Sequence, residues 1–115
     1  MRGTLSGRAV THLLARVGID AVTGPKDLFG QLKTNGFSVF PANDVPPSGR
    51  GEDGGFNGGY TVTRYGGSHH ANGIDAIQFE FGTTYRQDAE VDNTAKRAAK
   101  SIVVFNEAYL RRPTD

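Results

Sequence analysis

The longest regular pattern of apolar residues lies near the C-terminal end of the chain. Its apolar positions follow one another at alternating steps of four and three, as on one face of an α-helix: Val91, Ala95, Ala98, Ile102, Phe105 and Tyr109. Arg111 and Arg112 come next, and cations are favoured there because the C-terminal end of a helix is its negative pole. The pattern predicts one long C-terminal helix.

Two shorter segments, residues 7–17 and 28–36, show the same period. Their apolar positions are Val10, Leu13, Leu14 and Val17 in the first and Leu28, Phe29 and Leu32 in the second. Gly18 follows the first segment at the position of a left-handed C-cap, and Asn35-Gly36 closes the second, since both residues tolerate positive φ. Two short helices are expected.

The alternation of a β-strand is clearest in Ile74–Phe81. Apolar and other residues alternate there, with Ile77, Phe79 and Phe81 on one face and Ala76, Gln78 and Glu80 on the other. Three shorter runs also have strand composition: residues 19–22, 37–40 and 60–63. The fold class expected is α/β, with a small mixed sheet, the long C-terminal helix across one face and the two shorter helices alongside.

Two Gly- and Pro-rich stretches, residues 41–59 and 66–73, separate these elements. Neither helix nor strand can propagate through the first, and both are expected to be loops. The 115 residues suffice for one hydrophobic core but not for two. A single domain spanning residues 1–115 is expected.

Composition and charge exclude several classes of protein. There is no Cys, which excludes a disulfide framework and a thiolate metal site. Thirteen Lys and Arg face twelve Asp and Glu without a basic run, so no nucleic-acid partner is expected. No apolar stretch has the length of a membrane span, and neither a membrane partner nor a secretory signal is expected. A cytoplasmic protein is the resulting hypothesis.

Two segments carry a resemblance to a known family. Residues 56–66 read FNGGYTVTRYG and residues 73–81 read GIDAIQFEF. They resemble the C-terminal signature of the N-formylglutamate amidohydrolases, in which a Gly-Gly-Tyr-x-x-x-Arg-type loop precedes a strand reading Ala-Ile-Gln-x-Glu. Residues 27–32 and Gly36-Phe37 are similar to the family's preceding helix and loop. The resemblance extends over about residues 5–110 and implies a partial zinc-exopeptidase-like fold.

The resemblance also implies a chemistry, the hydrolysis of acyl or formyl amides of acidic amino acids with zinc as cofactor. Zinc lowers the pKa of bound water and polarises a carbonyl. Glu80 matches the strand carboxylate that would act as catalytic base. Arg64 matches the residue that anchors the substrate carboxylate, which a guanidinium pairs bidentately. Gly58, Gly59 and Tyr60 would complete the substrate-binding loop.

The chain departs from the family in its N-terminal half. The metal ligands of the family lie mainly in that half, whereas residues 1–50 contain only His12 and no Glu. The chain is therefore expected to be a truncated domain, incomplete as a metal-dependent enzyme on its own. His69 and His70 are the remaining candidate metal ligands, although adjacent residues of an extended chain point in opposite directions. One of them could combine with Asp75 or Glu80.

Three functions stay open on this evidence, and whether the chain is an enzyme stays open with them. The first is an amidohydrolase-like hydrolase that uses Glu80 and Arg64. The second is a non-catalytic module that binds a small carboxylate or a protein. The third is a small hydrolase, for example a nuclease, that uses His69, His70 and Glu80 with Arg64.

Structural roles compete with these functions. Arg64 could instead pair with Asp75 or Glu80, and His12 is expected to be a partly buried structural residue beside its helix stripe. A sheet without its neighbouring strands exposes edges or an apolar face, so a homo-oligomer or a partner chain that covers the exposed sheet is expected.

Overall fold

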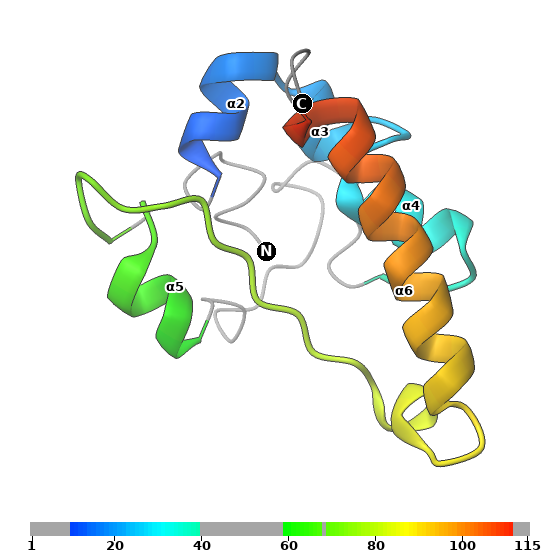
Figure 1. Ribbon diagram of the computed structural model, residues 1–115. Helices are drawn as coiled ribbons and strands as arrows, with labels where there is room; N and C mark the ends of the chain where they lie inside the picture. The colour runs from blue at the N-terminus through cyan, green and yellow to red at the C-terminus, as the bar shows by residue number, and fades with distance from the viewer. Residues whose placement is uncertain (1–9, 40–58, 68, 112–115) are drawn as a thin grey trace, which may run out of the picture.

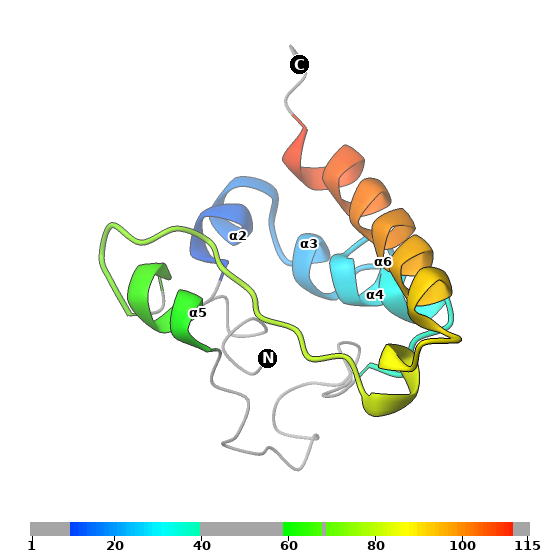
Figure 2. The same cartoon turned by 60° about the horizontal axis from the view of Figure 1, so that its bottom comes forward.

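The computed structural model describes residues 10–39, 59–67 and 69–111. Its elements are α2 (Thr11–Val17), α3 (Asp20–Thr23), α4 (Leu28–Thr34), α5 (Tyr60–Tyr65), the 3-10 turn η2 (Thr83–Arg86), α6 (Val91–Phe105) and the π-helical continuation η3 (Asn106–Leu110). Helices α4 and α6 lie side by side, while α5 lies at the opposite side of the molecule (Figures 1 and 2). An extended segment runs from the α5 region to η2.

The predicted α/β class, with its small mixed sheet and partial zinc-exopeptidase-like fold, is wrong for the part of the chain that the structure describes. That part is mostly helical and contains no strand, only an isolated bridge between Gly66 and Ile74. Two of the four strand candidates, residues 19–22 and 60–63, lie largely in α3 and in α5. Residues 37–39 form no regular element, and Phe40 lies outside the described residues.

The fourth strand candidate, Ile74–Phe81, is extended but pairs with a neighbour only at Ile74. Its alternation nevertheless assigned Ile77 and Phe81 to the core side, although Ala76 on the other predicted face is buried as well. Ile77 and Phe81 pack against the helical core, and the Phe79 ring lies edge-on to Phe29 with 5.7 Å between ring centres. The segment therefore packs against the helices through its side chains, and it forms no hydrogen-bonded ladder with another described segment.

The three predicted helices are confirmed where the structure describes them. Helix α2 covers the described part of the first and ends at Gly18, whose φ is +87°. Helix α4 begins at the buried cap Asp27, which accepts hydrogen bonds from the backbone nitrogens of Phe29 at 2.8 Å and Gly30 at 3.1 Å. Such a cap satisfies donors that have no partner within the helix. Helix α6 with η3 continues to Leu110.

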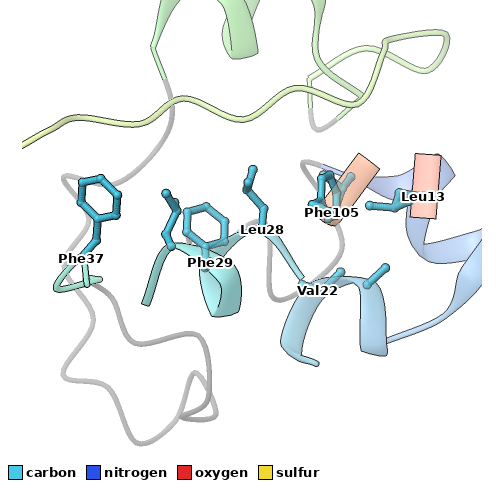
Figure 3. Packing of buried hydrophobic residues seen from close by; sticks show 9 residues of the cluster. Leu13, Val22, Leu28, Phe29, Phe37 and Phe105 are labelled. Atoms are coloured by element: carbon cyan, nitrogen blue, oxygen red, sulfur yellow. The ribbon is translucent and has the colours of Figure 1, made fainter. Parts of the chain in front are cut away.

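The core fills the space between α2, α3, α4 and the end of α6 (Figure 3). Its buried members are Val10, Leu13, Ala21, Val22, Leu28, Phe29, Leu32, Phe37 and Phe105. Because α2, α3 and α4 are short, they contribute one, two and three buried side chains, and each relies on its neighbours for burial. Across the described residues, no helix is long and apolar enough to cross a membrane.

Helix α6 turns a different face to the core than its apolar stripe predicts. Of the stripe, Phe105 is buried, whereas Ile102 is 48% exposed. Ser101 is fully buried in its place, and its hydroxyl accepts a hydrogen bond from the Asn35 amide nitrogen at 3.0 Å. The Arg97 guanidinium lies 4.5 Å from the centre of the Phe37 ring and donates to the Asn35 carbonyl oxygen at 3.2 Å. These contacts set the rotation of α6 against α4.

Replacing the small buried residue tests this rotation. Ser101→Leu should lower the free energy of unfolding by about 1–3 kcal/mol, since the added atoms have no space between α6 and α4. Asn93→Leu, on an exposed position of the same helix, should change it by no more than about 0.5 kcal/mol. Urea unfolding followed by circular dichroism measures both. Equal effects would mean that position 101 does not face α4.

Candidate functional site

Helix α5 carries two of the residues that the resemblance singled out, Tyr60 and Arg64, so they lie on a helix rather than on a loop and strand. Val62 is buried and attaches α5 to the rest of the chain. Tyr60 and Tyr65 are 74% and 51% exposed, and Arg64 is exposed beside them. The Arg64 guanidinium carbon lies 5.5 Å from the centre of the Tyr65 ring, within the range of a cation–π contact. A cation and two aromatic rings therefore face solvent together.

The two signature segments meet at the start of α5. Gly59 is the N-terminal cap of the helix, and the Gln78 side chain lies directly over it. A Cβ atom at Gly59 would come 1.6 Å from Gln78 Oε1, so the site tolerates only glycine unless Gln78 moves. A ligand could reach the Gly59 backbone only after displacing Gln78. Gly58, the other predicted glycine of the loop, lies outside the described residues.

The turn after α5 brings the extended segment back to the helix. The Ile74 backbone nitrogen donates to the Tyr65 carbonyl oxygen, and the Gly67 nitrogen donates to the Ile74 carbonyl oxygen, both at 2.8 Å. Gly73 is buried against Gly66, where a Cβ atom would come 2.4 Å from the Gly66 carbonyl carbon. The absence of a side chain at position 73 therefore allows this turn to close.

His69 and His70 lie in this turn and are both exposed. His70 Nε2 lies 3.0 Å from the Thr63 carbonyl oxygen. Because a carbonyl only accepts, this nitrogen must carry the proton and cannot bind a metal while the bond holds. Throughout the ranges that the structure describes, no three His, Asp or Glu side chains come together to hold a metal ion. The described donors do not fit a zinc site.

Asp75 has a structural task that the sequence did not reveal. Its two carboxylate oxygens accept hydrogen bonds from the backbone nitrogens of His12 at 3.0 Å and Leu13 at 2.7 Å, in the first turn of α2. The His12 ring nitrogen Nδ1 lies 3.3 Å from the same carboxylate. Asp75 thus caps α2 from another segment, and it pairs with neither Arg64 nor the two histidines of the turn. His12 is exposed rather than partly buried.

Glu80 lies on the extended segment with its side chain exposed. Within the described ranges it forms no ion pair with Arg64 and no hydrogen bond. The structure therefore brings Tyr60 and Arg64 together on one helix, with Gly59 at its start, but gives Glu80 no contact with them.

Two tyrosines with shifted pKa values lie beside α6, away from α5. The Tyr85 hydroxyl accepts a hydrogen bond from the Ser38 backbone nitrogen at 3.1 Å, and this bond, with the charge of Arg97, lowers its pKa. Burial, together with the charges of Asp20 and Asp27, raises the pKa of Tyr109. Both shifts follow from packing around α6 and provide no acid–base group near Arg64.

A small cavity lies in the core rather than at α5. Apolar side chains and Asp27 line it, among them Leu13, Phe29 and Ile77. It has room for about one water molecule. No candidate site residue lines it, so the surface of α5 remains the place where the predicted residues gather.

Comparisons of the chain with family models, with curated proteins and with solved structures find no match. The resemblance to the N-formylglutamate amidohydrolases stays a prediction from the sequence.

The glycine that closes the turn gives a test of this arrangement. Gly73→Ala should lower the free energy of unfolding by about 1–3 kcal/mol, because the new methyl group would press on the Gly66 backbone. Gly67→Ala is the matched control, since a Cβ atom there lies 3.5 Å from its nearest neighbour, and about 0.5 kcal/mol or less is expected. The midpoints of urea unfolding decide, and a similar loss in both variants would contradict the close contact at Gly73.

Proposed function

We propose that this chain is a non-catalytic binding module that takes up a small carboxylate ligand at the surface of α5, with Arg64 as its anchor. The supporting observation is that Arg64 is exposed, stacks beside Tyr65, and has no acidic partner among the residues described. A guanidinium presents a planar fork of donors that matches a carboxylate. Tyr60 and Tyr65 add apolar surface with a polar tip on either side of it.

The charges around α5 favour an anionic ligand. His69 and His70 follow the helix directly, and either adds positive charge when protonated. Asp75, on the segment that follows α5, is engaged with the first turn of α2. A ligand carboxylate would therefore meet no competition from Asp75 for Arg64.

Binding is favoured over hydrolysis because hydrolysis needs catalytic groups that the described residues of α5 do not bring together. An amide must be attacked by an activated water held close to both a base and an oxyanion stabiliser. Glu80, the expected base, has no contact with Arg64, and the described donors do not fit zinc. The residues on α5 supply recognition and orientation, not proton transfer.

N-formyl-L-glutamate is a suitable probe because it is a carboxylate ligand and also the substrate of the family that the sequence resembles. Calorimetric titration should show saturable binding without release of formate. Arg64→Ala should weaken binding by about tenfold or more, as expected for the loss of a charge-assisted hydrogen bond. Arg86→Ala removes another exposed arginine and should leave binding unchanged.

Other outcomes would reject the proposal in distinct ways. Formate release that disappears in Glu80→Gln would show a hydrolase. Absence of binding, or binding that Arg64→Ala leaves intact, would show that α5 is not a carboxylate site.

A further inference from the structure

The outward face of α6 carries an uncovered apolar strip. Its members, called here the outer strip, are exposed residues that lie along one side of α6 and η3: Ala95, Ala99, Ile102, Val103, Asn106 and Leu110. Ile102 is 48% exposed, Val103 53% and Leu110 44%. Aliphatic residues gathered on one side of a helix usually mark a contact surface. The helix cannot turn them inward, because Ser101 and Arg97 hold its opposite side against α4.

We propose that the outer strip is the interface of a homodimer in which α6 packs antiparallel against α6 of a second copy. A dimer with twofold symmetry uses the same surface on both chains, so that surface must be complementary to itself. The outer strip meets this condition when the twofold axis passes between positions 102 and 103. Position 95 then faces 110, position 99 faces 106, and position 102 faces 103. The aliphatic pairs are then Ala95 with Leu110 and Ile102 with Val103.

The charges beside the strip support the same arrangement. Lys96, Lys100 and Glu107 are exposed along one flank of the strip, and none has an ion pair with another described residue. In the antiparallel pairing Glu107 comes level with position 98 of the second copy, between its Lys96 and Lys100. Charge complementarity between Glu107 and these two lysines therefore supports the antiparallel dimer.

This inference replaces the sequence-based reason for expecting a homo-oligomer. That expectation rested on an exposed sheet, and the part of the chain that the structure describes has none. The helix face supplies a different reason. It is also independent of the proposed carboxylate site, because α5 lies on the opposite side of the molecule from α6 (Figures 1 and 2).

Disulfide crosslinking tests the pairing, because the chain contains no cysteine of its own. Under mild oxidation, Ile102→Cys should crosslink to itself across the twofold axis. Leu110→Cys should not, since the two copies of position 110 lie about 20 Å apart along antiparallel helices. A mixture of Ala95→Cys and Leu110→Cys should give crosslinked heterodimers. Crosslinking of Leu110→Cys with itself would indicate parallel helices and overturn the proposal.

Charge reversal gives a second, non-covalent test by sedimentation equilibrium of the full chain. Glu107→Lys should raise the dimer dissociation constant roughly tenfold or more, because it places a lysine between two others. Adding Lys96→Glu and Lys100→Glu to that variant should restore dimerisation. Lys26→Glu, at an exposed position distant in sequence, is the control and should have no effect.

Two results would end the proposal. One is a protein that stays monomeric at every concentration tested. The other is a dimer that neither crosslinks through Ile102→Cys nor responds to Glu107→Lys, which would have to form through another surface. Circular dichroism of each variant establishes that a loss of dimer is not a loss of fold.

Discussion

The contact between α4 and α6 decides what the rest of the molecule can present to its surroundings. Ser101 is fully buried with its hydroxyl satisfied, since it accepts from Asn35 and donates to the Arg97 carbonyl oxygen at 2.9 Å. Arg97 stacks on Phe37 and binds the same asparagine. Rotating α6 to bury Ile102 would break the hydrogen bonds that Ser101 and Arg97 make with Asn35. The polar contacts of Ser101 and Arg97 with Asn35 thus keep the outer strip of α6 exposed to solvent.

A second constraint places α5 and the extended segment. Asp75, which lies far from α2 in sequence, caps the first turn of that helix. The bridge between Gly66 and Ile74 brings the chain back to the end of α5. Asp75, on the segment that follows α5, is occupied by this cap. The same interaction that fixes α2 therefore keeps Asp75 from pairing with Arg64, and it also removes Asp75 from any metal site with His69 or His70.

The two proposed surfaces have different physical characters. The α5 surface is small, aromatic and cationic, and suits an anionic group that is partly exposed to solvent. The outer strip is aliphatic with charges on its flank, and suits another helix. Because the two lie on opposite sides of the molecule (Figures 1 and 2), a dimer through α6 would carry two α5 surfaces and could bind a bivalent partner more tightly than either chain alone.

Local spacing in the sequence was sufficient for α2, α4 and α6, but not for α3 and α5, whose residues it assigned to strands. The periodic residues of α4 and α6 and the terminating glycines at positions 18 and 36 all act within a few residues along the chain, and the structure confirms each of them. The alternation in Ile74–Phe81 placed Ile77 and Phe81 toward the core, because side chains alternate along an extended segment, but it missed the burial of Ala76. Arg64 and Tyr60 were found as neighbours, though on a helix.

The sequence by itself determined the three helices with regular apolar spacing and the extended conformation of Ile74–Phe81, but it assigned residues 19–22 and 60–63 to strands although they lie largely in α3 and α5. Only the tertiary structure decided that the extended segment has no ladder partner, that Asp75 caps a helix more than sixty residues away, and which side of α6 is buried. Each of these depends on a hydrogen-bond partner from a distant part of the chain. Periodicity cannot identify such a partner, because it shows which residues of an element are apolar on one face and not which polar group of a distant segment lies opposite them.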